Sequence, residues 1–196
     1  MAKQRVAILI SGRGSNMASL IAAAKDDSYP AEIALVLSNR PDAAGLDHAK
    51  RQGITTAVVD HTRYGKDRAA FEHALQDVLT AHRIELVCLA GFMRLLTPWF
   101  VGQWQGRMLN IHPALLPAFK GLHTHERAIE AGVKTHGATV HFVSAEMDSG
   151  EIIAQAEVPV LTGDTPDTLA ARVLEAEHRI YPQALRQVAK QLPHRD

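Results

Sequence analysis

The sequence predicts an α/β fold in which a doubly wound, mostly parallel sheet carries helices on both faces. Short apolar runs rich in valine, isoleucine and leucine alternate along the chain with segments of helical periodicity, which is typical of successive strand–helix–strand units. Glycine-rich or polar segments follow several of these runs. In an open parallel sheet, ligands bind outside the carboxyl ends of the strands. We therefore expect the functional residues in the loops that follow the strands.

Length and composition limit the organisation and the partners of the protein. The 196 residues, of which 46% are hydrophobic and 21% charged, are expected to form one domain over residues 1–196. The 21 basic and 21 acidic residues give a net charge of zero. Because no cluster of like charges occurs, neither nucleic acid nor a membrane is an expected partner. Small molecules are the expected partners.

The single cysteine and the absence of targeting patterns bear on location. Cys88 lies in an apolar run over residues 86–90, where we expect a buried hydrophobic residue rather than a nucleophile. One cysteine forms no internal disulfide, which fits a reducing compartment. No apolar stretch has the length of a signal-peptide core or of a membrane span. We expect a cytoplasmic protein.

A glycine-containing loop follows the first expected strand. Residues 5–10 predict a buried strand and residues 17–25 predict a helix, and between them stands Ser-Gly-Arg-Gly-Ser-Asn at residues 11–16. A strand, a glycine turn and a helix in this order direct free backbone N–H groups and the positive end of the helix at an anion. We expect Ser15 or Asn16 to cap the helix.

This loop lacks two common phosphate-binding patterns. The third glycine of the dinucleotide pattern G-x-G-x-x-G would fall at Met17, and no carboxylate placed for a ribose follows the second expected strand. The loop also does not match the nucleoside triphosphate pattern G-x-x-x-x-G-K-[ST]. Two interpretations stay open, namely a site for a single phosphate group and a tight turn with a helix cap.

The rest of the chain continues the alternation. Phe71, Leu75, Val78 and Leu79 recur at helical spacing and predict a core-facing stripe. Beyond the first strand and helix, we expect strands over residues 31–37, 55–59, 86–90, 137–143 and 152–160, another strand that ends at His112, and helices over residues 42–52, 66–82 and 165–187, from Pro98, and through Ala131. No repeat or low-complexity linker interrupts these elements, which supports one domain.

Residues 91–96, Gly-Phe-Met-Arg-Leu-Leu, are unusually apolar for a loop. They form either a buried connection to a helix that is capped by Thr97 and has Pro98 in its first position, or the apolar wall of a ligand pocket. In such a wall, Arg94 needs an anionic or polar partner. The presence of this arginine favours the pocket wall.

Two polar side chains stand at the end of the strand that precedes Pro113. Asn110 and His112 are two residues apart, so in a strand they point to the same face. An amide can donate to a developing oxyanion and an imidazole can transfer a proton, which suits a reaction at a carbonyl group. The alternative is a strand end that happens to carry two polar residues.

Asp148 is the best candidate to orient His112. A carboxylate next to an imidazole favours the protonated form of the ring and fixes its orientation. The alternative for Asp148 is a turn residue before Ser149 and Gly150, since Asp-x-Gly is a common turn composition. Spacing along the sequence does not decide between the two.

Histidines are concentrated in one part of the chain. Of the 11 histidines, those between positions 112 and 141 are His112, His123, His125, His136 and His141. No H-E-x-x-H or C-x-x-C pattern accompanies them, and His123 and His125 are expected in a loop. We therefore expect substrate contacts or loop hydrogen bonds from these residues, and no metal site.

Together these motifs resemble the phosphoribosylglycinamide formyltransferase family, the folate-dependent formyltransferases of purine synthesis. The resemblance is collinear from about residue 6 to residue 182. It rests on Ser-Gly-Arg-Gly-Ser-Asn at 11–16, Ala-Gly-Phe-Met-Arg at 90–94, Asn-Ile-His-Pro at 110–113, Leu-Leu-Pro at 115–117, Gly-Leu-His-Thr-His at 121–125, His-Gly-Ala-Thr-Val-His-Phe-Val at 136–143, Met-Asp-Ser-Gly at 147–150 and Glu-His-Arg-Ile-Tyr-Pro at 177–182. It implies a Rossmann-like formyltransferase fold.

The resemblance also implies roles for individual residues. The positions that match the catalytic trio of the family are Asn110, His112 and Asp148. Those that match the loop holding the substrate phosphate are Gly14, Ser15 and Asn16, and the carboxylate that binds the ribose hydroxyls is matched by Glu177. The surfaces that hold the folate are matched by Arg68, Met93, Arg94, Leu95, Leu96, Asn110, Ser144, Ala145, Glu146, Met147 and Asp148.

The reaction that the resemblance implies is a direct formyl transfer. The formyl group of 10-formyltetrahydrofolate, a cosubstrate, would pass to the amine of glycinamide ribonucleotide without a metal, in a monomer or a homodimer. Relatives that share the catalytic core add an RNA-binding or a regulatory domain, which we do not expect in this chain. Two alternatives stay open: hydrolysis of formyltetrahydrofolate, in which water replaces the amine, and a non-catalytic sensor of phosphorylated ligands.

Overall fold

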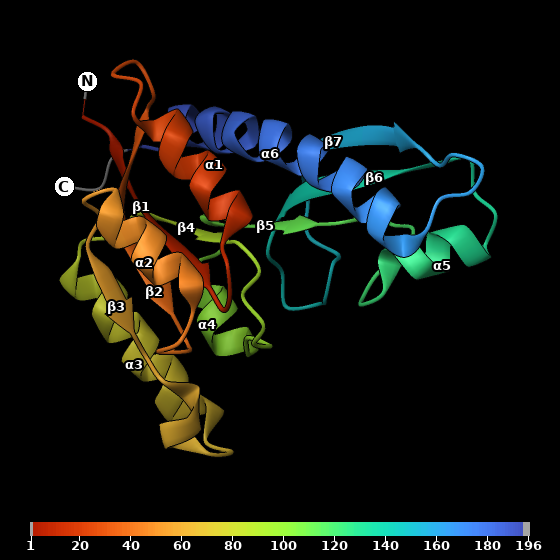
Figure 1. The fold of residues 1–196 in the computed structure, drawn as a ribbon. Helices are drawn as coiled ribbons and strands as arrows, with labels where there is room; N and C mark the ends of the chain where they lie inside the picture. The colour runs from red at the N-terminus through yellow and green to blue at the C-terminus, as the bar shows by residue number, and fades with distance from the viewer. Residues whose placement is uncertain (1, 194–196) are drawn as a thin grey trace.

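Strands and helices alternate along the described residues, 2–193 of the computed structural model (Figure 1). The strands are β1 (Gln4–Ile10), β2 (Ala31–Ser38), β3 (Thr56–Val58), β4 (Leu86–Leu89), β5 (Met108–His112), β6 (Thr135–Phe142) and β7 (Ile152–Pro159). The helices are α1 (Ser15–Ala24), α2 (Ala44–Arg51), α3 (Arg68–Ala81), α4 (Pro98–Gln103), α5 (Thr124–Glu130), α6 (Pro166–Gln191) and the short 3-10 helix η1 (His61–Tyr64). The predicted order is confirmed, and η1 is an addition.

The strands form one sheet in the order β3-β2-β1-β4-β5-β6-β7. Neighbouring strands are parallel from β3 to β5, whereas β6 is antiparallel to β5 and β7 is antiparallel to β6. The doubly wound, mostly parallel sheet is therefore confirmed. The order reverses at β1, which has β2 on one side and β4 on the other, and such a reversal opens a crevice at the carboxyl ends of the strands.

The two faces of the sheet bury separate sets of side chains, because successive residues of a strand point to opposite faces. In β1, Val6, Ile8 and Ile10 pack with α1, α2 and α6, whereas Ala7 and Leu9 pack with α3 and α4. All five side chains are fully buried, which explains why the run is continuously apolar. Within the described part of the chain, no helix is both long and apolar enough to cross a membrane.

Cys88 lies in the middle of β4 and is completely buried. Burial raises the pKa of its thiol to about 12. Since the thiolate is the reactive form of cysteine, this side chain is inert near neutral pH. The prediction of a buried, structural cysteine is confirmed.

The start of α1 differs from the prediction. Ser15 is the first helical residue, and the N-cap is Gly14, whose backbone is left-handed with a φ of 70° and which has no side chain to offer. The prediction that Ser15 or Asn16 caps the helix is wrong, because both are already helical and the Asn16 amide donates to Glu177. The N–H groups of the first turn therefore receive no side-chain cap, and they are free for another acceptor.

A buried tyrosine fixes α6 against the sheet. The hydroxyl of Tyr181 lies 2.8 Å from the carbonyl oxygen of Leu89 and 3.2 Å from that of Leu109, so that it bridges β4 and β5. The carbonyl of the next residue, Pro182, accepts a hydrogen bond of 2.7 Å from Tyr29. Both tyrosines are almost completely buried, and hydrogen bonds shielded from water are the stronger for it.

We predict that Tyr181→Phe lowers stability without changing the packing of α6. The substitution removes a buried hydrogen bond, which typically costs about 1–3 kcal/mol, and the free energy of unfolding in urea should fall by that amount. Tyr64→Phe is the matched control, because the Tyr64 ring packs on Phe71 and its hydroxyl makes no hydrogen bond among the described residues. An equal loss in both variants would contradict the assignment.

Candidate active site

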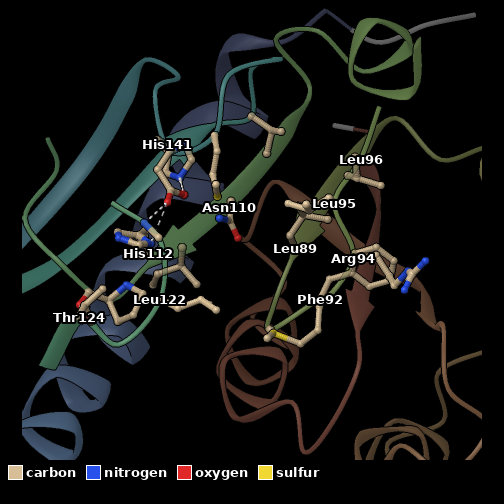
Figure 2. Close-up of a pocket in the computed structure, with 18 of the residues that line it drawn as sticks. Leu89, Phe92, Arg94, Leu95, Leu96, Asn110, His112, Leu122, Thr124 and His141 are labelled. Atoms are coloured by element: carbon tan, nitrogen blue, oxygen red, sulfur yellow. Dashed lines mark hydrogen bonds and ion pairs between the residues drawn. The ribbon is translucent and has the colours of Figure 1, made fainter. Parts of the chain in front are cut away.

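A pocket of about 520 Å³ opens at the carboxyl ends of β4 and β5. Its lining comes from the start of α1, the loop after β4, the end of β5, the loop before α5, the end of β6 with the loop that follows, and α6. Figure 2 shows Asn110 between His112 on one side and the apolar side chains of Leu89 and Leu95 on the other. The crevice expected from the strand order is therefore a cavity that contains the candidate catalytic residues.

β5 and β6 place three polar side chains on one face. Asn110 and His112 both line the pocket, as their two-residue spacing predicts. In the antiparallel pair, His141 stands opposite Asn110, and directly paired residues share a face of the sheet. His141 consequently also lines the pocket. In the sequence, His141 belongs to the histidine-rich region, but no local pattern places it beside Asn110.

His112 has a partner at each ring nitrogen and is 5% exposed. Its Nδ1 lies 3.6 Å from Oδ2 of Asp148, and its Nε2 lies 2.8 Å from the carbonyl oxygen of Phe119. Because a carbonyl can only accept, Nε2 carries a hydrogen, and Nδ1 is the nitrogen that faces the carboxylate. Protonation of Nδ1 therefore produces a cation with an acceptor at either end.

Asp148 is held between two imidazoles. Its Oδ2 accepts a hydrogen bond of 2.9 Å from the backbone N–H of Gly121, and its Oδ1 lies 4.0 Å from Nε2 of His141. Burial lowers the pKa of His141, and a hydrogen bond with the carbonyl of Phe142 and the charge of Asp148 oppose this effect only in part. His141 is thus disposed to stay neutral. His112 is the ring that lies nearer to Asp148.

Asn16 and Glu177 form a second polar pair in the pocket. The Asn16 amide donates a hydrogen bond of 3.2 Å to Glu177, and both residues are buried. Burial raises the pKa of Glu177 to about 7, an effect that the bond from Asn16 opposes. The amide oxygen of Asn16 is buried without a hydrogen-bond partner among the described residues. The pair therefore offers a ligand an acceptor and a carboxyl group that titrates near neutral pH.

The glycine-containing loop runs beside this pair. Of its residues, Asn16 lines the pocket, and Gly14 and Ser15 form the adjacent end of α1. The path of the loop is fixed by Gly45, whose N–H donates to the carbonyl of Gly12 at 3.0 Å. A side chain at Gly45 would clash, since its Cβ would lie 2.5 Å from the Ile10 side chain. Phosphate binding at this loop stays a prediction.

Residues 91–96 form the apolar wall of the pocket, because Gly91, Phe92, Met93, Arg94, Leu95 and Leu96 all line it. Met93 and Leu95 are 68% and 63% exposed, so this wall presents apolar surface to solvent. The Met93 N–H donates to the hydroxyl of Ser11 at 2.8 Å, which ties the wall to the end of β1. The partner of the Arg94 guanidinium is the ring of Phe71, at 5.8 Å.

Thr97 and Pro98 take their predicted positions as N-cap and first residue of α4. The Thr97 side chain makes no capping bond, because its hydroxyl and its backbone N–H both donate to the carboxylate of Glu72 on α3. This buried carboxylate anchors the far end of the apolar wall.

The remaining predicted folate contacts divide into two groups. Ser144, Ala145, Glu146 and Met147 line the pocket on the loop that leads to Asp148. Arg68 is exposed at the start of α3 and is not among the lining residues. Its role at the site stays a prediction.

Several lining residues received no role from the sequence, namely Leu89, Val101, Leu122, Thr124 and Val143. A sequence signal existed for His141 and Val143, because they are two residues apart in the run over 137–143 and so point to the same face of a strand. Thr124 had none, because its hydroxyl binds the carbonyl of Pro113 across a loop.

His125 and His136 form a hydrogen bond that connects the pocket with the interior. Nδ1 of His125 lies 3.1 Å from Nε2 of His136. Burial lowers the pKa of both residues, that of His136 to about 4. Among residues 2–193, no group of three or more histidine, cysteine, aspartate and glutamate side chains is arranged to hold a metal ion.

Comparison with known protein families assigns the chain to one class. The family model described as formyl transferase matches residues 4–185. The chain therefore belongs to the formyl transferase family.

Individual relatives narrow the class further. The chain is 45% identical over 177 residues to the phosphoribosylglycinamide formyltransferase of Escherichia coli, a match that covers 90% of this chain and 83% of that protein. It is similar to the crystal structure of phosphoribosylglycinamide formyltransferase from Brucella melitensis, with a TM-score of 0.92, 49% identity, and coverage of 99% of this chain and 100% of that one.

A third relative is much longer than this chain. The trifunctional purine biosynthetic protein adenosine-3 of Bos taurus is 52% identical over 187 residues, which is 95% of this chain. The chain spans 18% of the length of that protein. The similarity therefore concerns one part of a larger protein.

We predict that Glu177 makes stability depend on pH. Its pKa is raised from 4.5 to about 7 by burial, so between these values the folded protein keeps a proton that the unfolded chain has lost. The contribution of this group to the free energy of unfolding therefore falls as the pH rises from about 4.5 to about 7. The total fall is on the order of 3 kcal/mol.

Glu177→Gln removes this dependence while other titrating groups, including the buried histidines, are common to both proteins. The difference between the two proteins in the free energy of unfolding, measured in urea between about pH 4 and pH 8, therefore isolates the contribution of Glu177. The stability of the wild type relative to the variant should decline with pH. A difference that stays constant across the range would contradict the prediction.

Proposed function

We propose that the protein transfers the formyl group of 10-formyltetrahydrofolate to the amine of glycinamide ribonucleotide. The observation that carries the proposal is the meeting of Asn110, His112 and Asp148 in one pocket, between an apolar wall and the polar pair of Asn16 and Glu177. The family and the named relatives support the same chemistry.

Asn110 and His112 stabilise the charge that develops on the formyl oxygen. When the amine attacks the formyl carbon, the carbonyl oxygen becomes an oxyanion. The side-chain amide of Asn110 projects from the same strand face as His112 and can donate to it. The positive charge of a protonated His112 ring would stabilise it electrostatically, since both ring nitrogens already face acceptors, Asp148 and the carbonyl of Phe119. Donors that are fixed before the reaction act most strongly in a site that excludes water.

His112 and Asp148 also take part in the proton transfer that accompanies formyl transfer. Transfer forms a bond between the amine nitrogen and the formyl carbon and breaks the bond from that carbon to the folate nitrogen, so one proton must pass from the amine to the leaving nitrogen. His112 is placed to supply a proton to the leaving nitrogen. Asp148, at 3.6 Å, stabilises the charged ring. A water molecule beside it would take the proton from the amine and return it to His112, which restores the ring.

The two ends of the pocket match the two substrates. We assign the phosphate to the backbone N–H groups at Gly14, Ser15 and Asn16, which begin a helix with no side-chain cap. Glu177 would accept hydrogen bonds from the ribose hydroxyls. The exposed apolar wall, of which Figure 2 labels Phe92, Leu95 and Leu96, suits a flat heteroaromatic ring of the formyl donor.

The decisive experiment follows release of tetrahydrofolate from 10-formyltetrahydrofolate with and without glycinamide ribonucleotide. We expect release that requires the amine, together with formation of the formylated product. Release without the amine would indicate a hydrolase. Binding of the nucleotide with no release under either condition would indicate a sensor of phosphorylated ligands.

We predict that Asp148→Asn lowers kcat by about 100- to 10,000-fold, the range of a general acid–base contribution. Asparagine keeps the shape of the side chain and can still accept the Gly121 N–H, but it removes the negative charge beside His112. The KM values should change little, because the lost interaction belongs to the transition state.

Steady-state kinetics check this prediction, with Asp42→Asn as control, since Asp42 pairs with Arg40 at the surface. A rise in both KM values with unchanged kcat would refute the role assigned to Asp148.

A further inference from the structure

The loop between β5 and α5 has an unusual backbone. Phe119, Gly121 and His123 have φ values of 53°, 83° and 56°, and the left-handed region is unfavourable for the two residues that are not glycine. Residues 119–123, which we call the crossing loop, therefore need contacts outside their own backbone to hold this shape.

The crossing loop contacts both His112 and Asp148. The carbonyl of Phe119 accepts from Nε2 of His112, and the N–H of Gly121 donates to Oδ2 of Asp148. Between these two contacts, the Lys120 ammonium donates to the hydroxyl of Ser149 at 2.6 Å. A shift of this loop would consequently move the partners of His112 and Asp148 together.

One side chain that does not line the pocket holds the crossing loop. Nη1 of Arg127, on α5, donates to the carbonyl oxygens of Lys120 at 2.6 Å and Leu122 at 3.1 Å. The same guanidinium lies 5.5 Å from the centre of the Phe119 ring. Arg127 therefore contacts three of the five residues of the loop, and it is not among the residues that line the pocket.

We infer that Arg127 is a positioning residue, which sets the geometry of His112 and Asp148 through the crossing loop. This role rests on the proposed function. A planar guanidinium with several fixed donors suits the task, because it can bind two carbonyl groups and stack on a ring at the same time. α5 is anchored in the core by Ala128 and Thr124, which are buried, whereas Arg127 is exposed, so its contacts serve the loop rather than the core.

The test compares Arg127→Ala and Arg127→Lys with the wild type. Arg186→Ala is the matched control, since Arg186 also lies over an aromatic ring, that of Tyr29 at 4.9 Å, and bonds to Asp26 far from the pocket. The measurements are kcat, the KM for each substrate, the free energy of unfolding in urea, and hydrogen exchange of the Gly121 amide.

We expect Arg127→Ala to lower kcat by about 10- to 100-fold, as a misplacement of about 1 Å does, and to accelerate exchange of the Gly121 amide. The KM for glycinamide ribonucleotide should stay the same, because Asn16 and Glu177 bond to each other and, among the described residues, make no hydrogen bond with the loop. Lysine keeps a cation near both carbonyls, so Arg127→Lys should fall between alanine and the wild type. Arg186→Ala should change neither kcat nor exchange.

The inference is overturned if Arg127→Ala keeps kcat within about twofold of the wild type, well below the loss expected from misplacement, or if its Gly121 amide exchanges at the wild-type rate. It is also overturned if Arg186→Ala lowers kcat equally. Failure of the proposed function looks different, because the wild type itself would then show no amine-dependent release. The exchange of Gly121 would still report whether Arg127 holds the loop.

Discussion

The position of the Asp148 carboxylate is the constraint on which the rest of the site depends. Moving a carboxylate out of water is unfavourable unless charged or hydrogen-bonding groups of the protein replace the solvent. Here the replacement comes from two separate segments: the end of β5 through His112, and the crossing loop through Gly121. The loop after β6, the antiparallel pairing of β5 with β6 and the left-handed turns before α5 all meet at this carboxylate.

Helix α6 connects this site with the core of the sheet. Glu177 and Tyr181 are one turn apart, so they lie on the same face of the helix. Glu177 reaches the pocket and binds Asn16, while Tyr181 bridges the carbonyls of β4 and β5 directly before Asn110. Because the same buried face serves both contacts, the polar end of the pocket and the strand that carries Asn110 are fixed relative to each other.

The sequence predicted those parts of the structure that depend on local periodicity. The buried strands were recognisable from their apolar runs, and the shared face of Asn110 and His112 followed from the two-residue period of a strand. The parts that it missed depend on contacts between distant segments. His141 came to stand beside Asn110 through the register of an antiparallel pair, which no local spacing records.

The prediction of the N-cap of α1 was wrong for a related reason. Ser15 and Asn16 have the composition of a cap, but Asn16 is taken by Glu177 from the other end of the chain. A local preference therefore yielded to a tertiary contact, and Gly14 became the N-cap. Because the Asn16 side chain binds Glu177, it does not cap the helix. The N-terminus of α1 therefore stays open beside the pocket.

The two carboxyl groups of the pocket are set apart by their surroundings. Glu177 has one amide donor and is otherwise desolvated, so its pKa rises to about 7. Asp148 instead accepts a hydrogen bond from the backbone N–H of Gly121 and faces Nδ1 of His112. When two acids in one pocket have environments this different, they suit different tasks. Asp148 is positioned to orient His112, whereas Glu177 can exist in either form near neutral pH and so can accept a hydrogen bond from a bound hydroxyl group or donate one to it.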